Sequence, residues 1–325
     1  MSRVRYLQAL GKALRDEMER DPSVFVVGED VRESLRGVTK GLLDEFGESR
    51  VLDMPISEQM FTSFATGAAL AGRRAVVEYQ IPSLLYLAFE QIVNQAQKLR
   101  LMTGGQAKVP VVYLVPGSGA RLGLAGQHSD HPYSLFVHAG VKTVLPAFAS
   151  DAYGLLVSAV RDDDPVVFFA PAAALPTRDE VPDEPYAIPL GRGRIHREGT
   201  DATVVAIGHL VHDALVVADE LADEGVSIEV FDPRTLYPFD WELLGASLAR
   251  TGRLVVYDDA NRSCGLAAEI LATAAEEMPL TSPPKRVTRA DVTISFAVEL
   301  ELAALPSRER LRAAVREVVR EAAHR

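Results

Sequence analysis

Cysteine is almost missing from this chain, because Cys264 is the single one among 325 residues. One cysteine excludes an internal disulfide and a zinc site built from several thiolates, and a lone cysteine is typically a small buried apolar residue. The first twenty residues carry charges throughout and lack the apolar core of a signal peptide. No apolar run approaches the roughly 18 residues of a membrane-spanning helix. We therefore expect a cytoplasmic protein without disulfides.

Basic residues are scarce relative to acidic ones, with 34 Lys and Arg against 45 Asp and Glu and a net charge of −11. Nucleic acids and anionic membranes are bound through clustered cations, so this balance disfavours both as main partners. The 48% hydrophobic and 24% charged residues are typical of an ordered globular protein. A compact domain commonly has about 100–200 residues, so the length predicts two domains.

Buried strands and helices alternate along the first half of the chain. Residues 24–27 form a continuously apolar run that ends at Gly28. A strand without polar alternation suits a parallel sheet covered on both faces. The next predicted elements are a small-residue helix, a strand and a long helix, followed by strand, helix and strand: 57–72, 74–79, 84–103, 109–115, 151–161 and 166–169. This order predicts an α/β fold with a doubly wound sheet.

A proline-rich stretch separates this series from a second one. Residues 171–190 contain five prolines and no helical or strand period, which is typical of a linker. A second alternation follows, from a strand at 203–207 to a charged helix at 308–323. We therefore predict two doubly wound domains, 1–180 and a smaller one at 181–325.

A glycine-rich stretch at 116–126 follows a predicted strand and leads to two histidines. Its glycine spacing is one residue too long for the dinucleotide-binding fingerprint, so we expect a loop that lets the backbone approach a ligand. His128 and His131 lie three residues apart. They could be a surface pair or metal ligands, or His128 could act as an acid or base at the carboxyl edge of the sheet.

Carboxylates stand out at two other positions. Glu58 begins the predicted helix 57–72, where the helix dipole favours an acid and the small residues also allow a buried, interfacial carboxylate with a raised pKa. Asp162, Asp163 and Asp164 end the predicted helix 151–161. Such a run is usually a solvated turn, although carboxylates and free helix carbonyls can also hold a cation.

Several segments, in their order and spacing, resemble a known family over nearly the whole chain. They are similar to the beta subunit of the thiamine-diphosphate-dependent decarboxylating component of 2-oxo acid dehydrogenase complexes, in the transketolase-like superfamily. This resemblance implies a pyrimidine-binding transketolase-like domain followed by a smaller transketolase C-terminal-like domain. The matching segments are 27–31, 39–42, 55–58, 88–93, 127–129, 161–168, 232–238 and 265–270.

The resemblance implies roles for individual residues. Glu58 matches the glutamate that hydrogen-bonds the aminopyrimidine ring of thiamine diphosphate and favours its imino tautomer. His128 matches the histidine that faces the substrate and assists proton transfer to lipoamide. Ile56 and Gln80 match positions that line the pyrimidine. Leu84 departs from the family, which usually has an aromatic side chain stacked on the pyrimidine at this position.

The resemblance also implies metals and partners. Val112, Ala159, Asp162 and Asp164 match positions where the family holds a structural monovalent cation, K⁺. The superfamily binds the cofactor's diphosphate and Mg²⁺ through a Gly-Asp-Gly motif, which does not occur in this sequence. An alpha subunit is therefore expected to hold the diphosphate and Mg²⁺ in an α2β2 heterotetramer. A lipoyl-bearing acyltransferase or carrier protein is expected to accept the acyl group.

These features together predict an enzyme subunit that decarboxylates a 2-oxo acid and transfers the acyl group to a lipoyl carrier. One alternative is a split transketolase-like subunit that transfers a two-carbon ketol unit from a ketose. His131 favours this alternative, because a second polar group suits a hydroxylated substrate. The other alternative is a non-catalytic assembly subunit, which the departure at Leu84 allows and the presence of Glu58 and His128 disfavours.

Overall fold

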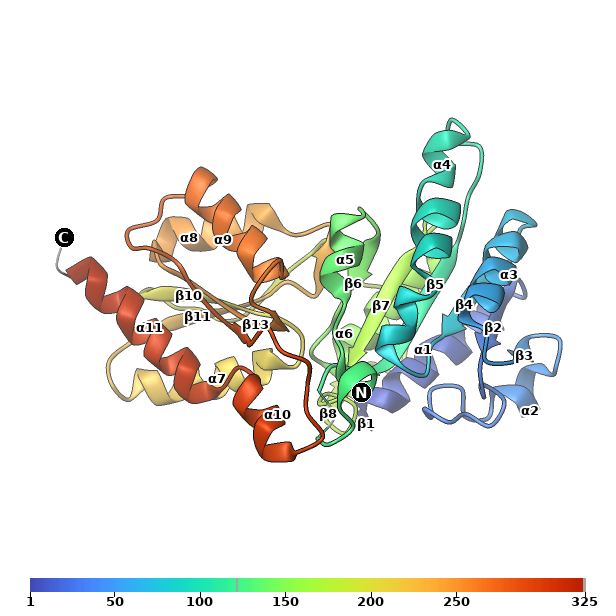
Figure 1. Cartoon of the computed structure of the whole chain (residues 1–325), viewed down its shortest axis with the longest axis horizontal. Helices are drawn as coiled ribbons and strands as arrows, with labels where there is room; N and C mark the ends of the chain where they lie inside the picture. The colour runs from blue at the N-terminus through green and yellow to red at the C-terminus, as the bar shows by residue number, and fades with distance from the viewer. Residues whose placement is uncertain (121, 324–325) are drawn as a thin grey trace. The chain divides into compact units, whose positions relative to one another are not determined.

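The computed structural model describes residues 1–120 and 122–323, which form two compact units (Figure 1). Each unit includes a short segment from the part of the chain predicted to form the other domain. Residues 122–126 group with the second unit, and residues 236–238 group with the first. Unit 1 contains 1–120, 127–190 and 236–238, and unit 2 contains 122–126, 191–235 and 239–323.

Unit 1 is built on a sheet of seven strands among the described residues. The pairings from β6 to β3 are parallel, and three of the strands are buried along their whole length. This arrangement confirms the α/β fold and explains the apolar runs without alternation. The strand order is β12 (Thr235–Tyr237), β6 (Lys142–Val144), β7 (Val166–Pro171), β5 (Val111–Ser118), β4 (Arg74–Glu78), β2 (Val24–Gly28) and β3 (Val51–Asp53).

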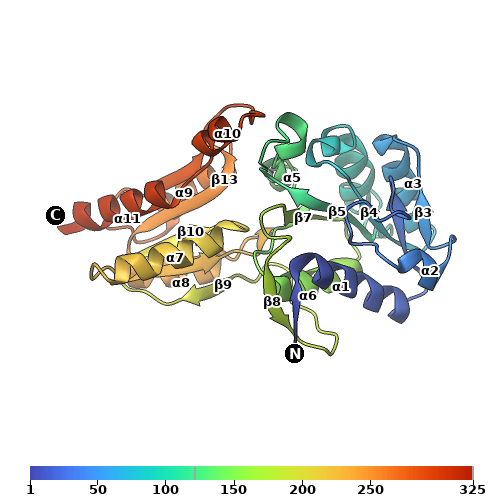
Figure 2. The same ribbon diagram turned by 90° about the horizontal axis from the view of Figure 1, so that it is seen from below.

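Helices cover both faces of this sheet (Figure 2). Helix α1 (Tyr6–Arg20) packs with α6 (Ala149–Arg161) on one face, and α3 (Glu58–Leu70) packs with the π-helix η2 (Gln91–Gln97) on the other. Helix α1 buries apolar side chains at helical spacing against the sheet, as its amphipathic sequence predicts. The shorter helices are α2 (Leu42–Phe46), η1 (Pro82–Tyr86), α4 (Leu99–Met102), η3 (Gly126–Ser129) and α5 (Tyr133–His138).

Unit 2 is a smaller three-layer α/β unit. Its sheet is parallel except for β9, in the order β14 (Lys285–Arg289), β13 (Leu254–Asn261), β10 (Ala202–Ala206), β11 (Ile228–Asp232) and β9 (Arg194–Arg197). Helices cover both faces of this sheet (Figure 1). They are α7 (Leu210–Ala222) with α11 (Arg308–Ala323), and α8 (Trp241–Thr251) with α9 (Leu266–Glu277); the short helix α10 (Val298–Ala304) precedes α11.

The prediction of an irregular linker at 171–190 was wrong in its middle. Strand β8 (Arg178–Val181) lies there and pairs antiparallel with β1 (Ser2–Arg5). Both strands are short, charged and largely exposed, so neither has the apolar pattern that marks a strand. Their pairing joins segments that are far apart in the sequence.

The predicted helix at 84–103 is broken into η1, η2 and α4. Pro82 opens η1, and the amide of Lys98 bonds to the carbonyl of Val93 five residues back. The expected burial of Cys264 was also wrong, because this side chain is exposed. Cys264 has a left-handed φ of 57° in the turn before α9, and a turn exposes its side chain.

Among the residues that the structure describes, no helix has both the length and the apolar character needed to cross a membrane.

Candidate functional site

Glu58 is the first residue of α3 and points into unit 1. It begins a stripe of buried residues at helical spacing that continues with Phe61, Thr62 and Ala65. Only 4% of Glu58 is exposed, so this side chain is buried. The hydroxyl of Thr62 donates to the backbone carbonyl of Glu58 and also hydrogen-bonds the hydroxyl of Tyr79. The buried face of α3 therefore positions the carboxyl group of Glu58.

Strands β2 and β4 bring more polar groups to the same edge of the sheet. Gly28 pairs with Glu78 across the two strands, and a Cβ at position 28 would lie 2.5 Å from the carbonyl oxygen of Glu78. Only glycine permits this approach. Beyond the strands, Nε2 of Gln80 donates to the carbonyl oxygen of Glu29 at 2.7 Å and to Oε1 of Glu78 at 3.3 Å. The carboxyl ends of parallel strands are where open α/β sheets bind ligands.

Arg36 supplies a cation beside these groups. Its guanidinium is half-buried and donates to the backbone carbonyl of Gln80. Burial lowers the pKa of Arg36, while the charges of Glu78 and Glu29 oppose that shift. We call Glu29, Arg36, Glu58, Glu78 and Gln80 the edge cluster. The cluster has three carboxyl groups and one guanidinium, which interacts with Glu78 and Glu29, so it has an excess of potential negative charge.

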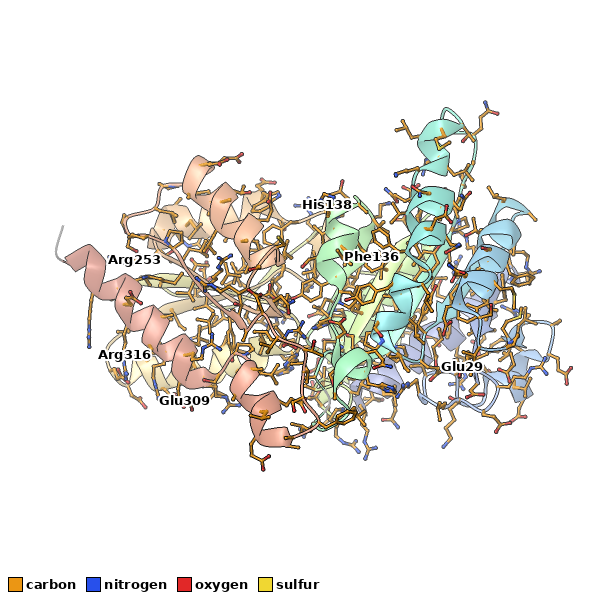
Figure 3. The ribbon with its side chains drawn as sticks, viewed as in Figure 1. Glu29, Phe136, His138, Arg253, Glu309 and Arg316 are labelled. Atoms are coloured by element: carbon orange, nitrogen blue, oxygen red, sulfur yellow. The ribbon has the colours of Figure 1, made fainter. Side chains whose placement is uncertain are left out.

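Burial raises the pKa of two carboxyl groups in the edge cluster. It raises the pKa of Glu78 to about 7, although the hydrogen bond from Gln80 and the charge of Arg36 oppose the rise. The pKa of Glu29 (labelled in Figure 3) is also raised, first by burial and then by the charges of Asp30 and Glu58. A carboxyl group that titrates near neutral pH can hold or release a proton during a reaction.

Three acceptor atoms of the edge cluster are buried without a hydrogen-bond partner among the described residues. They are Oε1 of Glu58, Oε2 of Glu78 and Oε1 of Gln80. Buried polar atoms in proteins are normally paired, so orphaned acceptors need an explanation. A ligand that presents N–H groups to this edge would pair them. This set of acceptors therefore fits a heterocycle that carries an amino group.

His128 lies near the carboxyl end of β5. It is partly buried in η3, and the residues just after it are tied to the end of that strand. The carbonyl of Asp130 accepts from the amide of Gly119 at 2.9 Å, and Nε2 of His131 hydrogen-bonds Oγ of Ser118 at 3.2 Å. Since β5 is parallel to β4, His128 is carried at the edge of the sheet that also bears the edge cluster.

The second histidine has a different environment. His131 is buried, and its ring packs edge-on against the rings of Tyr133 and Phe169 at centroid distances of 4.7 and 5.9 Å. One of its ring nitrogens is engaged with Ser118. His131 therefore contributes to the packing around β5, which weakens the argument for a hydroxylated substrate.

The two apolar positions predicted to line the cofactor lie outside the hydrogen-bonded cluster. Ile56 is 75% exposed in the segment that leads into α3. Leu84 is partly buried in η1, four residues after Gln80. Their side chains can contribute to a site only through apolar contact with a ligand or a partner surface.

The acidic turn after α6 is an ion-pair network. Nζ of Lys142 donates to both carboxylate oxygens of Asp162 at 2.8 Å and to Asp164 at 3.0 Å, and Arg100 also donates to Asp164. Although burial opposes the shift, the hydrogen bonds from Arg100 and Lys142 lower the pKa of Asp164. The carboxylates are thus neutralised by side chains of the same unit.

The other predicted cation positions contribute backbone groups. Val112 lies inside β5 and pairs with both β4 and β7. The carbonyl of Ala159 accepts from the amide of Asp162 at 3.3 Å, and Arg74 donates to the carbonyl of Asp162 at 2.8 Å. Since the carboxylates are paired, a cation at this turn would be held by backbone carbonyl oxygens.

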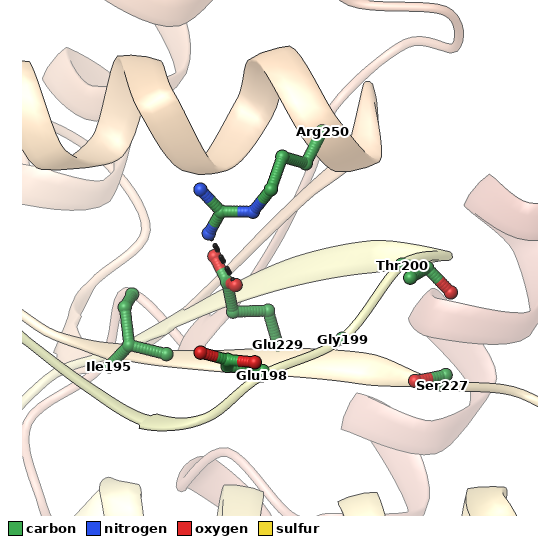
Figure 4. A pocket seen from close by; sticks show the side chains of 7 residues that line it. All are labelled: Ile195, Glu198, Gly199, Thr200, Ser227, Glu229 and Arg250. Atoms are coloured by element: carbon green, nitrogen blue, oxygen red, sulfur yellow. Dashed lines mark hydrogen bonds and ion pairs between the residues drawn. The ribbon is translucent and has the colours of Figure 1, made fainter.

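A surface pocket of about 440 Å³ lies in unit 2 and contains none of the predicted site residues (Figure 4). The buried carboxylate of Glu229 faces Arg250 there, at 2.6 Å between Oε2 and Nη2, and also accepts from Ser247. This pairing neutralises the charge of Glu229. The remaining lining residues are Ile195, Glu198, Gly199, Thr200 and Ser227.

Comparison with known proteins identifies the family. The transketolase pyrimidine-binding domain matches residues 2–177, and the transketolase C-terminal domain matches residues 191–311. The chain belongs to the transketolase family. The edge cluster and His128 both lie in the pyrimidine-binding domain, as the resemblance implied for Glu58, Gln80 and His128.

The similar members of the transketolase family are beta subunits. The chain is 39% identical over 321 residues to the acetoin:2,6-dichlorophenolindophenol oxidoreductase subunit beta of Bacillus subtilis, covering 93% of both chains. It is 41% identical to the mitochondrial pyruvate dehydrogenase E1 component subunit beta-2 of Oryza sativa, covering 92% of this chain and 82% of that one. The 2-oxoisovalerate dehydrogenase subunit beta of Bacillus subtilis is 35% identical, with 98% and 99% covered. These relatives confirm the resemblance to 2-oxo acid dehydrogenase beta subunits.

The transketolase fold itself is confirmed by a solved structure. A split-gene transketolase, described as an inactive beta4 tetramer, superposes with a TM-score of 0.80 over 98% of both chains at 24% identity.

Sequence reasoning did not single out three members of the edge cluster, Glu29, Arg36 and Glu78. Glu78 did leave a signal, because it is a charged residue directly after the apolar run at 75–77. Glu29 directly follows the buried strand β2 at the edge where ligands bind. Arg36 leaves no signal, since it lies in a loop with no periodic pattern.

Proposed function

We propose that this chain is the beta subunit of a heteromeric thiamine-diphosphate enzyme, which decarboxylates a 2-oxo acid and transfers the acyl group to a lipoyl carrier. The observation that carries the proposal is the buried Oε1 of Glu58 at the carboxyl edge of the sheet, which has no hydrogen-bond partner among the described residues. The beta-subunit relatives support the same assignment.

The residues of this chain would bind one end of the cofactor and handle protons. Bound thiamine diphosphate supplies a carbon nucleophile for the 2-oxo group and stabilises charge after carbon dioxide leaves. Glu58 would hold a proton against a pyrimidine ring nitrogen, and Gln80 would accept a hydrogen bond through its unpaired Oε1. Ile56 and Leu84 would add apolar contact, and His128 would move a proton during acyl transfer.

The proposal includes a partner chain and ions. An alpha subunit would hold the diphosphate and Mg²⁺ and complete an α2β2 heterotetramer, and a lipoyl-bearing acyltransferase or carrier would take the acyl group. The names of the relatives, which are beta subunits, support the alpha partner. K⁺ at the carbonyls of Val112, Ala159, Asp162 and Asp164 stays a prediction, tested by comparing activity in potassium and sodium salts. A cytoplasmic location is part of the same proposal.

The test is reconstitution with the alpha subunit and thiamine diphosphate, with decarboxylation of pyruvate and branched 2-oxo acids as the readout. Glu58→Gln and His128→Asn should each lower turnover by about 10²–10⁴-fold, the range of acid–base catalysis. The matched control is Glu33→Gln, an exposed carboxylate of the same domain, which should keep full turnover.

Three outcomes would contradict the proposal. Cleavage of a ketose without decarboxylation of any 2-oxo acid would favour the split-transketolase alternative. Full turnover in both the Glu58 and His128 variants would favour a non-catalytic assembly subunit. Full turnover in only one of them would remove the role proposed for that residue.

A further inference from the structure

Glu301 is a buried carboxylate with an unusual pair of partners. It lies on the short helix α10 with no exposed surface. Its Oε1 accepts from the backbone amide of Leu122 at 2.9 Å, and its Oε2 accepts from the amide of Gly123 at 2.6 Å. A carboxylate out of contact with water needs charge-assisted hydrogen bonds, and consecutive amides aimed at one anion form a nest that provides them.

The loop that provides these amides has a backbone that its sequence does not favour. Leu122 and Ala125 have left-handed φ values of 49° and 54°, as do Gly123 and Gly126 at 90° and 40°. Residues with a Cβ rarely adopt this region, so local preference does not hold the loop in shape. Contacts with residues in the C-terminal part of the chain hold the loop in this conformation. Besides the two bonds to Glu301, the amide of Gly126 donates to the carbonyl of Ile294 at 3.0 Å.

The fixed loop leads directly to His128. Gly126 is the first residue of η3, and His128 is the third. On the other side of His128, Asp130 is tied to Gly119 by a backbone hydrogen bond. His128 therefore follows directly on a loop whose backbone conformation depends on Glu301.

We propose that Glu301 is a positioning residue, which holds the Leu122–Gly123 turn and thereby the backbone conformation in which the chain enters η3, which contains His128. The proposal deepens the proposed function and rests on it for the catalytic role of His128. Both carboxylate oxygens of Glu301 accept hydrogen bonds from the two amides. Glu301 therefore acts through the loop and not on a substrate.

Three variants on α10 separate this role from a general effect on folding. Glu301→Ala removes both acceptors, and Glu301→Gln keeps one carbonyl oxygen and loses the charge. The matched control is Glu299→Ala, which removes an exposed carboxylate from the same helix. Glu301→Ala should therefore have the largest effect on the loop and Glu301→Gln a smaller one, while Glu299→Ala should behave as the wild type.

The first readout is hydrogen exchange of the chain in the absence of substrate and partner. Glu301→Ala should speed exchange of the amides at 122–129 about tenfold or more, the size expected for losing a charge-assisted bond, while exchange in β5 stays unchanged. Glu301→Gln should be intermediate. Faster exchange confined to Leu122 and Gly123, with 126–129 unaffected, would overturn the proposal.

The second readout is turnover in the reconstituted enzyme. Glu301→Ala should lower kcat about 10–100-fold with little change in KM, because a small displacement of a catalytic group costs rate and not binding. Unchanged kcat alongside a loosened 126–129 segment would overturn the proposal. If the wild-type enzyme turns over no 2-oxo acid, the proposed function fails, while the exchange experiment still decides whether Glu301 fixes the loop. If the alanine variant does not fold, the glutamine variant decides by the same measurements.

Discussion

Replacing Glu78 by glutamine should change how the stability of the chain depends on pH. Glu78 is fully buried in β4, and burial raises its pKa to about 7 from an ordinary 4.5. The substitution keeps the size of the side chain and the acceptor oxygen that faces Gln80. It removes only the ability to ionise.

The magnitude follows from the pKa of Glu78. A group whose pKa is raised on folding stabilises the folded state fully below its unfolded pKa, and this contribution is lost as the pH rises through the folded pKa. The rise from 4.5 to about 7 corresponds to roughly 3 kcal/mol. The wild-type chain should therefore lose about this much free energy of unfolding, relative to Glu78→Gln, between pH 4.5 and pH 8.

The assay is urea denaturation followed by circular dichroism at several pH values from 4.5 to 8, with Glu33→Gln as the exposed control. Glu78→Gln should match the wild type or fall slightly below it at pH 4.5 and become the more stable protein at pH 8. A difference in the free energy of unfolding that stays constant across this window would refute the reasoning. It would show that Glu78 does not change its protonation on folding.

Three further predictions concern packing, cofactor contact and the acidic turn. Leu10→Ala should lower the free energy of unfolding by about 2–5 kcal/mol in urea denaturation, because Leu10 is completely buried. The control Leu101→Ala, at a site 87% exposed, should change the free energy of unfolding by no more than about 0.5 kcal/mol. Equal losses in the two variants would contradict the assignment of Leu10 to the core. Leu84→Phe should lower the Kd for thiamine diphosphate in the assembled enzyme about 2–10-fold by ring stacking, and an unchanged Kd in a binding titration would show that this position does not contact the cofactor. Lys142→Met should lower the free energy of unfolding by about 1–3 kcal/mol at neutral pH and raise the pKa of Asp164. Acid unfolding should therefore begin at a higher pH than in the wild type. Coincident acid-unfolding curves would exclude the ion-pair network as a source of stability.

The regular elements of both units were predictable because their signal is local. The buried run Val24–Gly28 and the helix that begins at Glu58 carry their apolar pattern in a few consecutive residues. The pairing of β1 with β8 was not predictable in this way, since two short charged strands acquire their partners only through the tertiary fold. The π-helix at Gln91–Gln97 has no distinct residue pattern either.

The candidate site was predictable in part and for a similar reason. Glu58, Gln80 and His128 were found because the residues around them resemble a family. Glu78 and Arg36 were missed, because their importance depends on burial and on which loops meet at the edge of the sheet. Burial also decided whether His131 is a polar group for the substrate or a packing residue, because its ring lies against Tyr133 and Phe169.

The exchange of segments between the two units has a consequence for fragments of this protein. Cutting the chain near residue 190, between the two family domains, leaves an N-terminal fragment whose residues 122–126 lack Glu301 and a C-terminal fragment whose β12 lacks the sheet neighbour β6. Each fragment therefore contains one segment whose structural partner lies on the other fragment. The two pieces should therefore complement each other when expressed together, and each should be less stable when expressed alone.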